Sequence, residues 1–168
     1  DTGQRSGNYP NALPLPLTLG FEVAGTIVSR GPGVGGPAAG TRVVALVEGG
    51  YAEYALAKAE LAVTLPENVS FTQATVIPVQ GQTAYLALTR GAHFSQGETV
   101  LVHAAAGGVG SLAVQVAKIL GAGTVIGTTT SDSKLSVIRG LGADVAVNSK
   151  SENWIEQVMQ VTRGQGVD

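Results

Sequence analysis

Residues 98–130 read ETVLVHAAAGGVGSLAVQVAKILGAGTVIGTTT, and this stretch decides the fold. A short apolar run at 100–102 is typical of a strand buried on both faces. The small-residue turn AAAGGVG follows at 104–110, and apolar residues over 112–120 then recur at near-helical spacing. A second apolar run at 125–126 follows two glycines that can end the helix. The order strand, glycine turn, helix, strand predicts the first half of a parallel α/β nucleotide-binding unit.

The glycine turn has the chemistry of a phosphate cradle. A pyrophosphate can approach backbone N–H groups only where side chains are absent, and the next helix presents its positive end to the anion. Ala105 stands where the first glycine of G-x-G-x-x-G is usual. A tight strand-to-helix turn without a ligand is the alternative interpretation. The predicted phosphate-binding residues are Ala106, Gly107, Gly108, Val109 and Gly110.

This stretch also resembles a known family. VLVHAAAGGVGSLAVQVAKILGA, VIGTTTSDSK and LGADVAVN, together with DTGQRSGNYP and LGFEVAGTIVSRGPGV nearer the start, are similar to the zinc-independent quinone oxidoreductase branch of the medium-chain dehydrogenase/reductase family. The resemblance covers essentially the whole chain, which corresponds to about half of such a protein. It implies a GroES-like, mostly β barrel domain at 1–78, lacking its opening strands, and a Rossmann NADP-binding domain at 79–168, whose doubly wound parallel sheet is incomplete.

Composition excludes several other classes. The 168 residues are 44% hydrophobic and 13% charged, as in a globular protein. A formal net charge of −2 argues against nucleic acid as a partner. No apolar run approaches the ~20 residues of a membrane span. We therefore expect no membrane partner and a cytoplasmic location.

The sequence contains no cysteine, so thiolate zinc sites within it are excluded. By the resemblance, zinc alcohol dehydrogenases carry a histidine ligand between Gly20 and Glu22, where this chain has Phe21. We expect no metal, and we expect Glu22 to pair with a cation or a backbone N–H. The two histidines, His93 and His103, are too isolated for a metal site, and His103 is expected to bind backbone.

The first part of the chain predicts loop, then β-structure. Residues 1–20 are rich in Gly, Pro and Asn and are expected to form loop. Tyr9 either packs over this loop or, by the resemblance, lines the substrate cleft as the catalytic hydrogen-bond donor. Short strands are expected at 23–30, 42–47, 51–57 and 61–65. Tyr54 and Lys58 have the Tyr-x-x-x-Lys spacing of short-chain dehydrogenases, but they precede the glycine turn in a strand-like run, which argues against that mechanism.

Two short helices are expected before the glycine turn. Ser70 is a candidate N-cap for the first, and the second spans 83–90. By the resemblance, the Thr83 hydroxyl donates to the nicotinamide. A helix N-cap is the alternative role for Thr83.

The end of the second Rossmann strand bears on the choice of cofactor. NAD-specific folds place an acidic residue there, whereas this chain has hydroxyl groups at 128–131 and then Lys134. Hydroxyls and an ammonium accept a 2′-phosphate that a carboxylate would repel. Capping of the next helix is the alternative reading, and Asp132 lies later than the expected acidic position. Lys134 matches the family's phosphate-binding lysine, and Ser149 stands where many relatives have a stacking tyrosine. The predicted 2′-phosphate ligands are Thr129, Thr130, Ser131 and Lys134.

The remaining chain continues the alternation, with a helix at 132–141, a strand at 144–147 and a helix at 152–161. A half-built parallel sheet leaves an edge unpaired. The resemblance implies an NADPH-dependent oxidoreductase that passes a hydride to a quinone or an activated alkene without metal, as a homodimer when full length. The alternative is an NADPH-binding structural or sensing protein without turnover.

Overall fold

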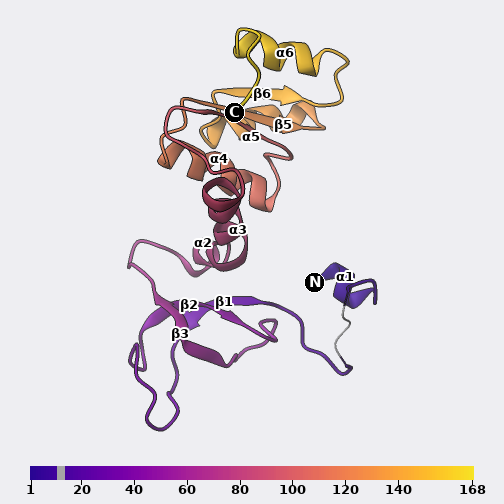
Figure 1. Ribbon diagram of the computed structural model, residues 1–168. Coiled ribbons are helices and arrows are strands. Elements are labelled where there is room, and N and C mark those ends of the chain that lie inside the picture. Colours follow the sequence, from indigo (N-terminus) through magenta and orange to yellow (C-terminus); the bar gives the residue numbers. More distant parts are fainter. Residues whose placement is uncertain (11–13) are drawn as a thin grey trace. The chain divides into compact units, whose positions relative to one another are not determined.

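The computed structural model describes residues 1–10 and 14–168. Contacts divide the chain into two compact units, Asp1–Val79 and Gln80–Asp168. Each unit has its own sheet (Figure 1). None of the helices among the described residues is long and apolar enough to cross a membrane.

The first unit is built on an antiparallel meander. Its strands are β1 (Glu22–Thr26), β2 (Arg42–Val47) and β3 (Ala57–Thr64), in that order across the sheet. The core lies on central β2, where Val44 and Ala45 are buried. β2 has the bounds that its apolar run predicts.

Two predictions for this unit are wrong. No strand begins at Tyr51, because the backbone of Gly50 and Tyr51 donates hydrogen bonds to Gly20 and Leu19 instead of joining the ladder (2.9 and 2.8 Å). β3 is therefore one strand that starts at Ala57. The segment expected to be loop contains a helical turn, α1 (Thr2–Arg5). Backbone hydrogen bonds among residues 1–6 stabilise this turn.

Helical segments follow the meander. They are α2 (Phe71–Ala74), the π-helical η1 (Ile77–Gly81), α3 (Gln82–Leu86) and the π-helical η2 (Ala87–Gly91). Ser70 caps α2 as predicted. Its hydroxyl accepts the N–H of Gln73, and the Gln73 side chain accepts the N–H of Ser70, which forms a capping box.

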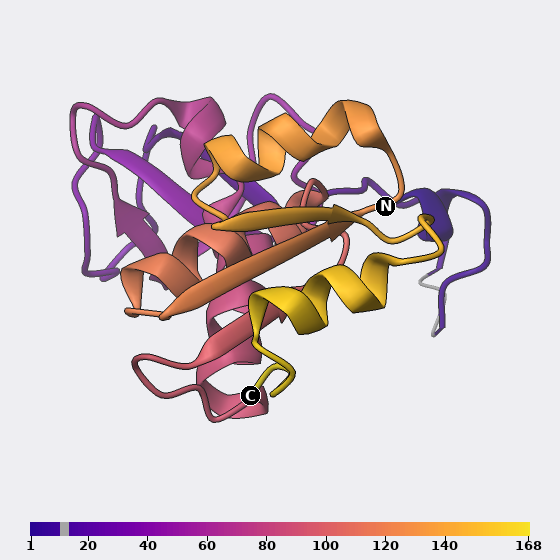
Figure 2. The same ribbon diagram turned by 90° about the horizontal axis from the view of Figure 1, so that it is seen from above.

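The second unit contains a parallel sheet in the order β4 (Thr99–Val102), β5 (Thr124–Thr129), β6 (Val145–Asn148). Its helices are α4 (Gly108–Ile119), α5 (Leu135–Gly140) after the 3₁₀ turn η3 (Asp132–Lys134), and α6 (Trp154–Val161). α5 and α6 lie on opposite faces of the strands (Figure 2).

Adjacent residues of β5 supply the two cores of this unit. Val125 packs with Val114 of α4 and Ile138 of α5 on one face, whereas Ile126 packs with Val158 of α6 on the other. All five side chains are buried. A parallel sheet covered on both faces confirms the predicted Rossmann arrangement.

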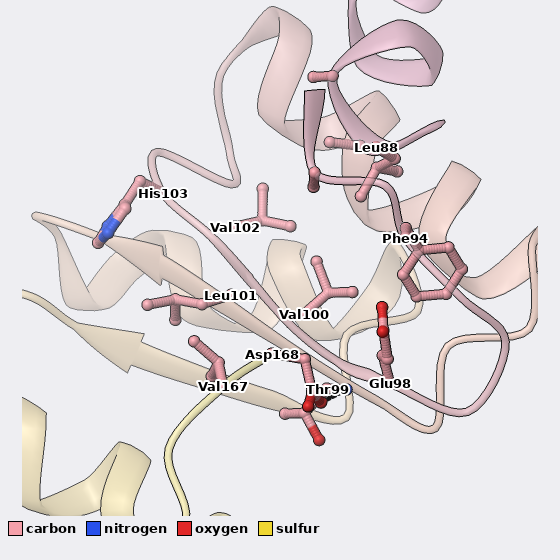
Figure 3. A pocket seen from close by; sticks show the side chains of 13 residues that line it. Leu88, Phe94, Glu98, Thr99, Val100, Leu101, Val102, His103, Val167 and Asp168 are labelled. Atoms are coloured by element: carbon pink, nitrogen blue, oxygen red, sulfur yellow. Dashed lines mark hydrogen bonds between the residues drawn. The ribbon is translucent and has the colours of Figure 1, made fainter. Parts of the chain in front are cut away.

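β4 is an edge strand of this three-stranded sheet. On the edge away from β5, Asp168 donates its N–H to Thr99 O (3.2 Å) and accepts the N–H of Thr99 on its carboxylate (2.8 Å). An apolar recess lies beside this edge, where Leu101 faces Val167, and Val100 and Val102 project to the other side of the strand (Figure 3).

Candidate cofactor site

The turn between β4 and α4 has an unusual backbone. Ala104 has a φ of 50°, in the left-handed region that side chains disfavour. This conformation turns its carbonyl towards the N–H of Gly107, which donates to it at 2.8 Å. Gly107 is the N-cap of α4, and the helix begins at Gly108, earlier than apolar spacing alone predicts. The turn therefore reverses the chain immediately after the strand.

Two glycines of the turn are held close to other groups. A Cβ at Gly110 would collide with the carbonyl oxygen of Ala104, so the first turn of α4 packs directly on the backbone. A Cβ at Gly108 would collide with the side-chain amide of Gln80. Gln80 is a neighbour that sequence reasoning missed, because nothing in its local pattern distinguishes it.

The start of α4 has the geometry of an anion site. The first N–H groups of a helix have no carbonyl one turn earlier to bind, and the helix dipole places positive charge around them. Gly107, Gly108 and Val109 are exposed, and α4 is 12 residues long. The chain thus brings the predicted cradle residues 106–110 together at one exposed turn at the carboxyl end of β4, and they fit a phosphate group.

The hydroxyl cluster after β5 divides into a buried and an exposed part. Thr128 and Thr129 are buried, at 2% and 6% exposure, whereas Thr130 is exposed. The carbonyl of Thr129 accepts the N–H of Ser149 at 2.8 Å and its hydroxyl at 3.2 Å. Thr129 thus fixes the end of β6 against β5, and Thr130 offers the more accessible hydroxyl.

The η3 turn, with its N-cap Ser131, carries two of the predicted 2′-phosphate ligands. The Ser131 and Ser133 hydroxyls lie 2.9 Å apart, and Lys134 is exposed. Asp132 accepts a hydrogen bond from the Asn148 amide at 2.8 Å. None of the salt bridges among the described residues involves Lys134. This contact of Asp132 was also missed, because Asn148 is 16 residues away in sequence.

His103 is bound differently from the prediction. Its Nδ1 lies 3.1 Å from the hydroxyl of buried Thr128, so its partner is a side chain and not the backbone. Its ring also meets Trp154 edge-on, with centroids 6.1 Å apart. The prediction was wrong because the parallel register places the end of β4 beside β5, which spacing along the chain does not reveal.

The other two candidate residues lie in different units. Thr83 is the second residue of α3 and is exposed, and Gly81 is the N-cap of that helix, so the alternative capping role for Thr83 is wrong. Tyr9 belongs to the first unit and is 48% exposed. Its ring lies near Gly3, 3.7 Å from the position of an added Cβ there.

Glu22 has the structural role expected of it. Its carboxylate accepts the N–H of Val79 at 3.0 Å. Phe21 beside it is 38% exposed. Within 1–10 and 14–168, no three His, Cys, Asp or Glu side chains are grouped as metal ligands would be.

Both halves of the chain match known domain families. Residues 1–67 match the alcohol dehydrogenase GroES-like domain, and residues 108–168 match the zinc-binding dehydrogenase domain. The chain belongs to the medium-chain dehydrogenase/reductase family. The predicted order, a GroES-like domain followed by a Rossmann-type domain, is confirmed.

Within this family, the chain is similar to quinone oxidoreductases. The quinone oxidoreductase of Pongo abelii is 38% identical over 170 residues, which cover 100% of this chain and 51% of that protein. The structure of Escherichia coli quinone oxidoreductase complexed with NADPH has a TM-score of 0.86 and 38% identity, covering 99% of this chain and 51% of that one. The structure of the CurK enoyl reductase has a TM-score of 0.82 and 36% identity, and the match covers 99% of this chain and 49% of that one. The chain thus spans about half the length of the relatives it matches.

Proposed function

We propose that this chain binds NADPH and belongs to an oxidoreductase that transfers a hydride to a quinone or to an activated alkene. The observation that carries the proposal is the glycine turn, where exposed backbone meets the amino end of α4. The NADPH complex of the similar Escherichia coli enzyme supports the choice of cofactor. The CurK enoyl reductase supports the activated alkene as the second acceptor class.

Each part of the site has a proposed role. The turn of residues 106–110 binds the pyrophosphate, mainly through the N–H groups at the start of α4, because the N–H of Gly107 already donates to Ala104. The hydroxyls of Thr130 and Ser131, with the Lys134 ammonium, bind the 2′-phosphate. Thr129 contributes mainly by fixing the strand end, and the Thr83 hydroxyl donates to the nicotinamide. Tyr9 is the proposed donor to the substrate oxygen. The bound NADPH supplies the hydride, while the protein orients the reactants and excludes water.

We propose that the reaction needs no metal. Phe21 stands where zinc alcohol dehydrogenases carry a histidine, and its ring has no atom that can bind a metal. No thiolate is present in the 168 residues. Polarisation of the substrate oxygen is then left to hydrogen-bond donors, which suits quinones and enones because both accept a hydride at an already electron-poor carbon.

The sharpest test of the phosphate cradle uses Gly108. The three heavy atoms nearest to a Cβ there all belong to the Gln80 side chain, so Gln80→Ala makes room for it. In that background, Gly108→Ala is expected to preserve folding and to weaken NADPH binding, because its methyl group projects from backbone that the pyrophosphate must approach closely. The measurement is the NADPH dissociation constant by fluorescence titration, with Gln80→Ala alone as the matched control.

Turnover separates the enzyme from a binding protein. NADPH oxidation is followed with a panel of quinones and enones, and at least one class is expected to be reduced. In the binding experiment above, normal NADPH binding by the folded Gly108→Ala, Gln80→Ala protein would mean that the phosphate cradle lies elsewhere. Binding by the wild type without turnover across the panel would replace the enzyme with a sensing or structural protein.

A further inference from the structure

Asp132 presents a problem for the proposed site. It is the first residue of η3, and Lys134 is the last residue of the same short turn. A carboxylate beside a bound 2′-phosphate repels it, and a carboxylate beside Lys134 competes with the phosphate for the ammonium. A site that prefers NADPH must therefore control where this carboxylate is directed.

The structure holds the Asp132 carboxylate from the β6 side. Asn148, the last residue of β6, donates its Nδ2 to Asp132 Oδ1 at 2.8 Å. The Asn148 Oδ1 accepts the N–H of Lys150 at 3.0 Å. Because the amide oxygen already has a donor, the amide nitrogen faces the carboxylate.

Asn148 is itself held in place by the sheet. It pairs with Thr129 in the parallel register of β5 and β6, and it is half-buried. The next residue, Ser149, is fixed to the Thr129 carbonyl. The end of β6 therefore gives the amide a defined position, whereas Asp132 and Lys134 are exposed on a short turn.

We propose that Asn148 is a positioning residue for cofactor specificity. By binding Asp132, it keeps that carboxylate away from Lys134 and from the phosphate monoester, so that the ammonium is available to the ligand. This inference rests on the proposed binding of NADPH, and it assigns the discrimination between NADPH and NADH partly to a residue that touches neither cofactor.

The test compares ligands with and without the phosphate. Dissociation constants for NADPH, NADH and 2′,5′-ADP are measured at one fixed salt concentration. Asn148→Ala is expected to weaken the binding of NADPH and 2′,5′-ADP by about two- to fivefold, which is the size of an exposed charge interaction. NADH binding is expected to stay unchanged. Asn153→Ala serves as a control, since Asn153 is an exposed asparagine that accepts a hydrogen bond from Gln157 at the start of α6.

A second substitution shows whether the effect passes through Asp132. In an Asp132→Ala background there is no carboxylate for Asn148 to hold. Asn148→Ala should then no longer change the ratio of the NADPH and NADH dissociation constants. Equal losses for both cofactors, an unchanged ratio, or an effect that persists without Asp132 would each overturn the inference. If the wild-type protein binds neither NADPH nor NADH, the proposed function fails instead, which distinguishes the two.

Discussion

Lys134 carries the clearest prediction at the scale of a single residue. Lys134→Ala should weaken NADPH binding and leave NADH binding nearly unchanged, because in the proposed site the ammonium contacts only the 2′-phosphate. A buried charge-assisted contact contributes about 1.5–3 kcal/mol, and exposure reduces this, so a loss of about two- to tenfold in affinity is expected. The measurement is a pair of dissociation constants at fixed salt, because ions screen exposed charges.

Thr89→Ala is a suitable control for this experiment, since Thr89 lies in η2, outside the η3 turn, and its hydroxyl donates to the Tyr85 carbonyl of α3. Equal losses for NADPH and NADH would mean that Lys134 supports the fold and not the phosphate. A wild-type preference for NADH would contradict the cofactor assignment itself.

Ala104 gives a prediction about stability. A side chain in the left-handed backbone conformation of this residue destabilises the folded state by about 1–2 kcal/mol, and glycine removes that strain. Glycine also makes the unfolded chain more flexible, which lowers the free energy of unfolding by about 0.4–1 kcal/mol. Ala104→Gly should therefore stabilise the protein by about 0.5–1 kcal/mol, measured as the free energy of unfolding in urea. The matched control is Ala106→Gly in the same turn, where φ is not positive and glycine should destabilise. If the two variants lose stability equally, Ala104 is not strained.

The residues of the site were only partly predictable from sequence. Gly107, Gly108 and Gly110 were identified because a phosphate turn needs bare backbone, which is a local requirement. The Asn148–Asp132 and Gln80–Gly108 contacts join residues far apart in the chain, and no local pattern marks them. Thr129 shows the same limit, since its burial depends on the strands on either side of it.

Among the elements, α4, β5 and β6 are joined by one carboxylate. Asp144, just before β6, accepts the N–H of Val125 at 2.7 Å and both of its oxygens lie 3.0 Å from the Lys118 ammonium of α4. Burial alone would raise the pKa of Asp144, but the Val125 N–H and the Lys118 charge outweigh burial and hold its pKa below its ordinary value of 3.8.

This depressed pKa predicts how stability depends on pH. A carboxyl group whose pKa is lowered by folding stabilises the folded state above its unfolded pKa, and the contribution is lost as pH falls through the folded pKa. Asp144→Asn should therefore reduce the free energy of unfolding at pH 5–7, and the difference from wild type should shrink as the pH falls from 3.8 through the lowered pKa of the folded state. The effect is modest because the carboxylate is 40% exposed.

Urea unfolding at a series of pH values measures this difference, with Glu156→Gln on the exposed side of α6 as the control. A difference that grew as the pH fell would have the wrong sign and would contradict the role given to Asp144.

Elements were predicted best where the physical signal is local. The bounds of β2 follow from an apolar run between turns, and α2 begins where Ser70 supplies a cap. The prediction failed at 51–57 because Gly50 and Tyr51 hydrogen-bond to residues 19–20, and the chain there has β-forming residues without a ladder to join. Helix α4 starts before its apolar pattern does, because glycines form its first turn.

For the whole molecule, the prediction concerns metal. Prolonged dialysis of the protein against a strong chelator should leave NADPH oxidation intact, because the proposed chemistry uses hydrogen-bond donors and the position of a zinc ligand is taken by Phe21. Activity is measured before and after dialysis with a quinone acceptor, and a zinc-dependent alcohol dehydrogenase treated in parallel is the control. Substantial loss that zinc restores would refute the metal-free proposal.

The architecture of each unit was predictable because two different sequence patterns follow one another along the chain. Short runs with glycine and proline punctuation give the antiparallel meander, and strand–helix alternation gives the parallel sheet. The resemblance supplied the names of these domains, and the domain matches confirm them. How β4 meets Asp168 could not be predicted, since it depends on a contact between residues 69 positions apart.

The hydrogen bond from Val125 to Asp144 also provides a spectroscopic handle. An amide proton that a carboxylate accepts at 2.7 Å is strongly deshielded, so in a proton–nitrogen NMR spectrum the Val125 resonance should lie well downfield and shift as Asp144 is protonated. The rate at which the Val125 amide proton exchanges with deuterium reports how often the contacts between α4, β5 and the start of β6 open. One resolved signal would thus follow the integrity of the nucleotide-binding sheet without any ligand present.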